Sequence, residues 1–165
     1  MKRTEPRSRD RALAWLARRE YSGLELRERL ARTGCPEPEI ASLLEELRNE
    51  GAQSDERFTE EFVRIRRIRG EGPIRIARAL EARGIGRELA ARHLARTEGE
   101  WVRAAEEARA ARFGGALPED AGRQGIQARF LLRRGFSAAT VAGLWQSWGR
   151  AFLEEASSGT PDGEE

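Results

Sequence analysis

Three glycines recur along the chain at intervals of 50 and 51 residues, and each follows a leucine by four positions. The pairs are Leu30 and Gly34, Leu80 and Gly84, and Leu131 and Gly135. A glycine can adopt the left-handed conformation that ends a helix, while a leucine one turn earlier packs that helix onto its neighbours. The pattern therefore predicts tandem helical repeats of about 45 residues, each of which needs its neighbours for stability.

The apolar residues are spaced as in helices almost throughout, and no segment alternates as a strand does. Proline and glycine divide the chain into three groups of three helices. We expect helices over 12–21, 24–30 and 36–51, then 55–69, 73–84 and 87–94, and finally 101–112, 126–134 and 137–152. Asp55 is expected to cap the helix that begins with it. The predicted fold is all-α, an elongated tandem array of three-helix repeats.

The expected organisation follows these groups. We predict a flexible N-terminus over 1–9, repeats over 10–51, 52–96 and 97–152, and a disordered acidic tail over 153–165. The third repeat is the loosest, because a long link with glycine and proline, 113–125, separates its first two helices. The end of the tail, 157–165, has no apolar residue that could anchor it to a core.

The charge is distributed unevenly, although the formal net charge is only +2. Residues 37–56 contain seven acids and one arginine, whereas 121–150 contain five arginines and no acid. No apolar run approaches the roughly 20 residues of a membrane helix, and Cys35, the only cysteine, cannot form an intrachain disulfide. We expect a cytoplasmic monomer with no membrane contact. The uneven distribution of charge along the chain bears on its choice of partner.

The sequence shows no catalytic constellation. His93 is the only histidine, and without a cysteine cluster it predicts neither a zinc site nor a general base. The segment 70–73 (Gly-Glu-Gly-Pro) lacks the preceding strand and the following Lys-Ser/Thr that a phosphate-binding loop requires. We interpret it as a turn between helices, and we expect neither enzymatic activity nor a cofactor.

Arginines project from the predicted helices opposite their apolar faces. Arg67 is expected opposite Phe58 and Phe62, and two pairs spaced by three or four positions project together from the middle helices of the second and third repeats. The candidate partner-binding residues are Arg64, Arg67, Arg75, Arg78, Arg129, Arg133 and Arg134. Such a set fits an acidic protein surface or nucleic-acid phosphates. The plainer alternative is a solvated face on an arginine-rich protein.

Three segments carry a resemblance to a known family. The segment 55–64 (DERFTEEFVR) followed by 70–76 (GEGPIRI), together with 129–137 (RFLLRRGFS), resembles the signature of the RecX family, and the resemblance covers roughly 10–152. The chain departs from the family where Gln53 and Ser54 replace the usual aromatic and aliphatic residues, and where the third repeat has a longer link.

The resemblance implies a tandem array of three-helix units that binds the RecA–DNA filament. The implied function is to modulate, usually to inhibit, RecA activity in recombinational repair and the SOS response. Two rival interpretations stay open. One is a helical protein that binds nucleic acid directly, because short helices around a glycine turn suit a groove. The other is a helical adaptor with no role at nucleic acid.

Overall fold

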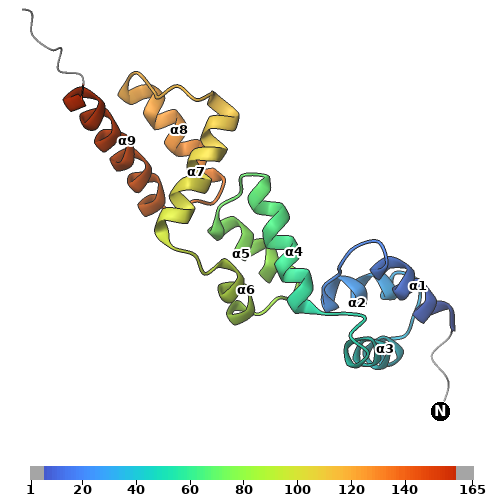
Figure 1. The fold of residues 1–165 in the computed structure, drawn as a ribbon. Coiled ribbons are helices and arrows are strands. Elements are labelled where there is room, and N and C mark those ends of the chain that lie inside the picture. Colours follow the sequence, from blue (N-terminus) through green and yellow to red (C-terminus); the bar gives the residue numbers. More distant parts are fainter. Residues whose placement is uncertain (1–5, 159–165) are drawn as a thin grey trace, which may run out of the picture. The chain divides into compact units, whose positions relative to one another are not determined.

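The computed structural model describes the backbone of residues 6–158 and the side chains of residues 8–149. Within this range every regular element is a helix, so the predicted all-α class is confirmed (Figure 1). The helices are α1 (Pro6–Leu16), α2 (Gly23–Ala31), α3 (Glu37–Asn49), α4 (Asp55–Ile68), α5 (Pro73–Glu81), α6 (Arg87–Leu94), α7 (Glu98–Phe113), α8 (Ala121–Arg133) and α9 (Ala138–Ser158). None of the described helices is long and apolar enough to cross a membrane.

The helices form two compact units. The first contains the residues up to Arg66 together with Ala77–Ala95, and the second contains Arg67–Ile76 together with the residues from Arg96 onward. The division passes through α4 and α5, so the middle trio of helices contributes to both units. The sequence periodicity gives no sign of this sharing, and the boundaries of the three repeats stay a prediction.

Leucine and isoleucine build the core of the first unit. α2 packs against α3, and both present an apolar stripe to the interior (Figure 1, blue). The fully buried side chains of this core include Leu26, Leu30, Ile40, Leu43 and Leu47. Burying such side chains is the main favourable contribution to folding.

The leucine–glycine pairs that predict the repeat behave alike in all three copies. Leu30, Leu80 and Leu131 are each 0% exposed. Their glycines have φ values of 84°, 77° and 93°, in the left-handed region. In each copy the N–H of the residue after the glycine donates to the leucine carbonyl, at 3.4, 3.1 and 3.2 Å. This bond closes the end of the middle helix, so the prediction of a shared helix end is confirmed.

The DERF segment links the helices of the first unit. Ser54 caps α4 through the N–H of Arg57, at 3.2 Å. Asp55 instead accepts a hydrogen bond from the backbone N–H of Gly23 at the start of α2, at 2.9 Å. The expectation that Asp55 caps its own helix is therefore wrong, because the adjacent serine already fills that role. Buried Gln53, 2% exposed, donates to the same Asp55 oxygen at 2.9 Å.

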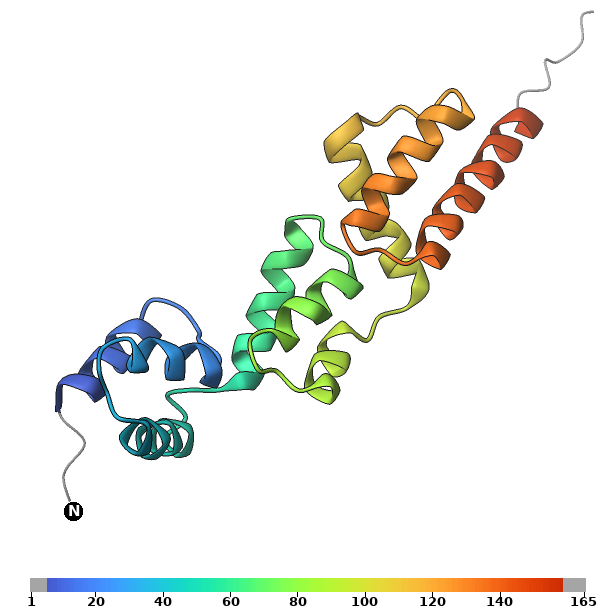
Figure 2. The same ribbon diagram turned by 180° about the vertical axis from the view of Figure 1, so that it is seen from behind.

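In the second unit α7 packs against α8 and α9, as both views show (Figures 1 and 2). Trp101 and Phe136 meet edge to face in its interior, with ring centroids 6.5 Å apart. Arg109 on α7 is fully buried. Its guanidinium binds both carboxylate oxygens of Glu106 and donates to the carbonyl of Ala116 at 3.1 Å. A charged side chain thus holds the α7–α8 link in place.

Several helix ends differ from the expected ones. α1 begins at Pro6, within the segment expected to be flexible, because proline suits a first helical turn. It ends at Leu16 rather than near Tyr21, because the following residues reverse the chain before Ser22 caps α2. α9 continues to Ser158, past the expected end at 152, because no glycine or proline interrupts 153–158. Residues 1–5 and 159–165 lie outside the described range.

α7 and α8 begin earlier than expected. Thr97 and Glu100 form a reciprocal capping box at the start of α7. Asp120 caps α8, accepting from the N–H of Arg123 at 2.8 Å. The expected link over 113–125 therefore shrinks to the residues between Phe113 and Ala121. Both caps are visible in the sequence as Thr-x-x-Glu and as an aspartate after a proline-containing segment.

Candidate basic interface

Two of the segments that carry the family resemblance, 70–76 and 129–137, dock onto each other in the second unit. The N–H of Gly72 donates to the carbonyl of Arg134 at 2.8 Å, and the N–H of Ile74 donates to the carbonyl of Gly135 at 3.0 Å. The start of α5 therefore lies against the turn that follows α8. This contact determines which arginines of the two segments lie close together.

Glycine is required on both sides of this contact. A Cβ atom on Gly72 would overlap the backbone of Gly135 and Phe136, and one on Gly135 would overlap Arg75. The lack of side chains lets the two backbones meet directly. As a result, the Arg75 side chain reaches the end of α8 and donates from Nη1 to the Arg133 carbonyl at 3.4 Å.

Arg129 and Arg133 lie one turn apart on the outer face of α8. Both are exposed, and neither forms an ion pair with any residue of the described chain. The opposite face of the helix is buried through Gln127 and Leu131. Guanidinium groups that no internal carboxylate neutralises can bind carboxylates or phosphates in bidentate fashion.

Apolar side chains are interleaved with these arginines. On α8, Leu132 is 47% exposed and Ile126 is 51% exposed. Ile74, next to Arg75 at the start of α5, is 43% exposed. The surface therefore combines positive charge with aliphatic area.

Arg134 has a positioning role in this surface. It is half-buried, lies 5.6 Å from the ring centroid of Phe130, and donates to the carbonyl of Arg69 at 2.7 Å. This bond places the backbone of exposed Arg69, which the sequence reasoning missed, beside Arg134 at the end of α8. Its adjacency to Gly70 in the GEGP segment is the one sequence signal for it. We call Arg69, Arg75, Arg129, Arg133 and Arg134 the basic cluster.

Glu71 lies within the basic cluster, and its side chain is 6% exposed. One of its oxygens is 3.5 Å from Nε of Arg75. The carboxylate therefore offsets part of the charge of Arg75 and leaves Arg129 and Arg133 as the least compensated members.

Arg67 lies differently from the expectation that it points into solvent. Its guanidinium is 5.7 Å from the ring centroid of Trp101, and the side chain is half-buried. Burial lowers the pKa of Arg67, and the nearby charge of Arg96 lowers it further. The helical periodicity identified the apolar face of α4 correctly, but it could not show that Trp101 of α7 lies against Arg67.

Arg64 and Arg78 belong to the first unit. Arg64 is exposed and binds both carboxylate oxygens of Glu61, at 2.9 and 2.7 Å. The hydrogen bonds that Arg64 donates to Glu61, together with the negative charge of Glu61, raise the pKa of Arg64. Arg78 is exposed on α5 and has no ion pair with a described residue. Of the seven candidate arginines, Arg75 at the start of α5 donates to the carbonyl of Arg133, and Arg129, Arg133 and Arg134 lie along the last turns of α8.

Comparison with known proteins agrees with this helical architecture. The family model described as "RecX, first three-helix domain" matches residues 9–47, and "RecX, second three-helix domain" matches 54–94. The chain is 45% identical over 141 residues to the regulatory protein RecX of Chromohalobacter salexigens, covering 86% of this chain and 92% of the relative. It is 43% identical over 133 residues to the regulatory protein RecX of Halorhodospira halophila, and the match covers 81% of this chain and 83% of that relative.

Solved structures show the same fold. RecX from Lactobacillus salivarius superposes with a TM-score of 0.72 at 22% identity, covering 86% of this chain and 94% of that one. A second structure, of a regulatory protein RecX, gives a TM-score of 0.74 at 19% identity, covering 87% and 72%. The fold is therefore that of a helical-repeat protein, and the relatives that the chain matches are named regulatory proteins. The chain belongs to the RecX family of regulatory proteins.

Proposed function

We propose that the protein binds the RecA nucleoprotein filament and inhibits RecA recombinase and ATPase activity. Segments 55–64, 70–76 and 129–137 resemble RecX sequences, and this resemblance supports the choice of RecA as the partner. The observation that carries the binding role is the basic cluster, in which Arg129 and Arg133 are exposed without an internal carboxylate.

The composition of this surface favours a protein partner over bare nucleic acid. Phosphate recognition needs cations and hydrogen-bond donors, whereas protein interfaces also bury aliphatic side chains and are enriched in arginine. Leu132 and Ile74 supply aliphatic area between the arginines, at 47% and 43% exposure. The proposed mechanism is occlusion: the bound protein blocks the addition of RecA subunits or the access of duplex DNA.

Binding to three targets tests this proposal directly. Labelled protein is titrated at physiological salt with RecA alone, with single-stranded DNA alone, and with RecA–DNA filaments formed with a slowly hydrolysed ATP analogue. The proposal predicts the tightest binding to filaments and a decrease in RecA ATP hydrolysis over the same concentration range. Equal affinity for naked DNA and filaments, with the same dependence on salt, would support the nucleic-acid alternative instead.

A further inference from the structure

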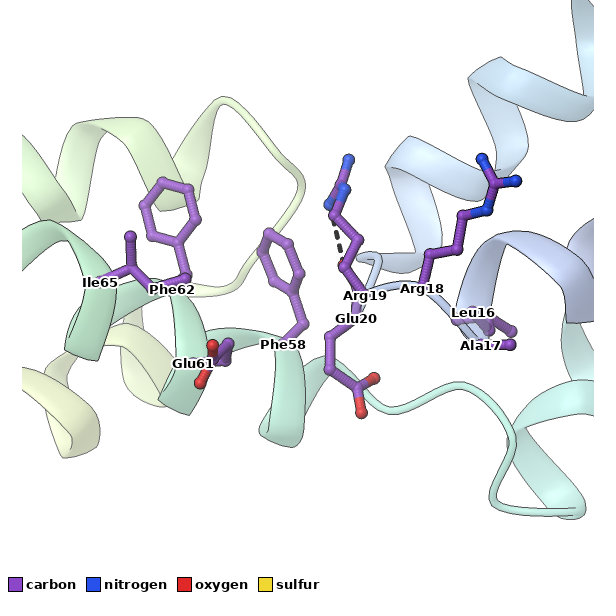
Figure 3. Close-up of a pocket in the computed structure, with 9 residues that line it drawn as sticks. All are labelled: Leu16, Ala17, Arg18, Arg19, Glu20, Phe58, Glu61, Phe62 and Ile65. Carbon is purple, nitrogen blue, oxygen red and sulfur yellow. Dashed lines mark hydrogen bonds between the residues drawn. The ribbon is translucent and has the colours of Figure 1, made fainter.

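A pocket in the first unit lies outside the basic cluster. It has a volume of about 390 Å³ and is formed by the end of α1, the segment after it, and one face of α4 (Figure 3). Its apolar wall consists of Leu16 from α1 and of Phe58, Phe62 and Ile65 from α4. All of these residues belong to the same compact unit.

The wall remains partly open to solvent. Phe58 is 3% exposed and anchors the wall, and its ring centroid is 5.5 Å from that of Phe62. Leu16, Phe62 and Ile65 are only half-buried. Concave apolar surface of this size on a water-soluble domain is typical of a binding site rather than of a closed core.

Two acids at the rim are already paired within the chain. Glu20 lies 2.7 Å from Nε of Arg57, and Glu61 lies 2.7 Å from Nη2 of Arg64. In Figure 3 the Glu20 carboxylate points to the side opposite the rings of Phe58 and Phe62. These acids therefore add little negative charge to the mouth of the pocket.

The remaining rim is basic. Glu25 is shared between Arg19, at 3.0 Å, and Arg83, at 3.4 Å, so one carboxylate serves two cations. Arg83 also lies 4.9 Å from the ring centroid of Phe62. Exposed Arg18 has no carboxylate partner in the described part of the chain, and its guanidinium points to the same side as the phenyl rings in Figure 3. The rim therefore keeps a surplus of positive charge.

We propose that this pocket binds a short acidic segment of a partner protein through one large aromatic side chain. The aromatic ring fills the space beside Leu16 and Phe62, and the flanking carboxylates meet the guanidinium groups of Arg18 and Arg19. The chain's own residues 159–165 contain acids but no aromatic or branched aliphatic residue, so they lack the anchor that the pocket requires. This site shares no residue with the basic cluster and does not depend on the proposed function.

The test measures fluorescence anisotropy of a labelled peptide, Glu-Asp-Phe-Asp-Glu, titrated with the full chain. One comparison peptide has alanine in place of phenylalanine, and another has lysine in place of every acid. We expect both changes to weaken binding about tenfold or more, because one removes a buried ring and the other reverses the charge complementarity.

Variants of the protein locate the site. Ala17→Trp fills the pocket from its lining, and Ala14→Trp adds the same ring at another exposed alanine at the end of α1. Arg18→Glu reverses the rim charge, and Arg11→Glu reverses an exposed arginine elsewhere on α1 that forms no ion pair with a described residue. We expect A17W and R18E to abolish or strongly weaken peptide binding, and the two control variants to bind as the parent does.

Three outcomes would overturn the proposal. The first is equal binding of the three peptides. The second is peptide binding that survives A17W. The third is a dimer, seen by sedimentation, that A17W dissociates, since this would make a second copy of the chain the occupant of the pocket.

Discussion

Gly72 and Gly135 approach so closely that a side chain on either one would overlap the other segment. The two residues lie far apart in the sequence, yet the N–H of Gly72 donates to Arg134, immediately before Gly135, at 2.8 Å. This junction packs together two segments that are separate in the sequence, 70–76 and 129–137. It also explains why arginines of both segments share a surface.

Replacing Gly135 by alanine tests this junction. Gly135 combines a φ of 93° with the overlap that its Cβ would make with Arg75, whereas Gly34 has a φ of 84° and open space around it. We expect Gly34→Ala to lower the free energy of unfolding by about 1–2 kcal/mol through backbone strain alone. Gly135→Ala should lower the free energy of unfolding by about 1–3 kcal/mol more than Gly34→Ala does, because segments 70–76 and 129–137 must move apart to admit the Cβ atom. Urea denaturation of both variants gives this difference, and equal costs would argue against the close contact.

The repeated leucine is tested in the same way. Leu80→Ala should lower the free energy of unfolding by about 2–5 kcal/mol, because the side chain is 0% exposed and its loss leaves a cavity. Leu30→Ala and Leu131→Ala should behave alike. Leu132, 47% exposed beside Leu131, is the matched control and should change stability by less than about 0.5 kcal/mol. Three tolerated core substitutions would contradict the repeat register.

The sequence predicted the parts of the fold that depend on local chemistry. The leucine–glycine pairs determine where the middle helices end, because that end needs one buried side chain and one residue with positive φ. Proline and glycine likewise marked most of the helix boundaries. These requirements concern residues within one or two helical turns of each other, so they can be recognised from the sequence alone.

Contacts between segments far apart in the sequence could not be read in this way. Arg67 was expected in solvent because periodicity describes one helix and says nothing of α7, whose Trp101 lies 5.7 Å from its guanidinium. Arg69 lies beside Arg134 because its backbone carbonyl accepts a hydrogen bond from the Arg134 guanidinium. Neither relationship follows from helical periodicity.

Arg109 is the clearest residue that sequence reasoning overlooked. It resembles any other arginine on a helix, yet it is fully buried with partners in Glu106, Ala116 and Gln127. We expect Arg109→Ala to lower the free energy of unfolding by about 2–5 kcal/mol, because it removes a fully buried side chain and leaves the half-buried Glu106 carboxylate and the Ala116 carbonyl without their donor. Exposed Arg103 on the same helix is the control, and Arg103→Ala should stay within about 0.5 kcal/mol of the parent in urea denaturation.

Acid should selectively weaken the contact between α4 and α6. The hydrogen bond from His93, 2.6 Å away, and then the pair with Arg92 hold the pKa of Glu56 below its ordinary value of 4.5. A lowered folded-state pKa means that the ionised carboxylate stabilises the fold above its ordinary pKa, and that this contribution is lost as the pH falls through the folded-state value. Glu56→Gln should therefore lower Tm at pH 7, and the difference from the parent should shrink at strongly acidic pH.

The control for this experiment is Glu60→Gln, since Glu60 is exposed on α4 and has no ion pair with a described residue. Its Tm should follow that of the parent at every pH. A Glu56→Gln difference that is the same at all pH values would show that the ionised carboxylate is not responsible.

The basic cluster is proposed to inhibit RecA, and charge reversal at Arg129 and Arg133 tests this role most directly. The measurement is RecA ATP hydrolysis on single-stranded DNA as a function of protein concentration. The double variant R129E/R133E should keep its Tm, because exposed charges contribute little to folding. It should inhibit at least tenfold less potently than the parent, with the largest difference at low salt, where charges are least screened. R11E/R27E makes the same change in charge at two exposed arginines of the first unit and should inhibit as the parent does. Full inhibition by R129E/R133E would contradict the account.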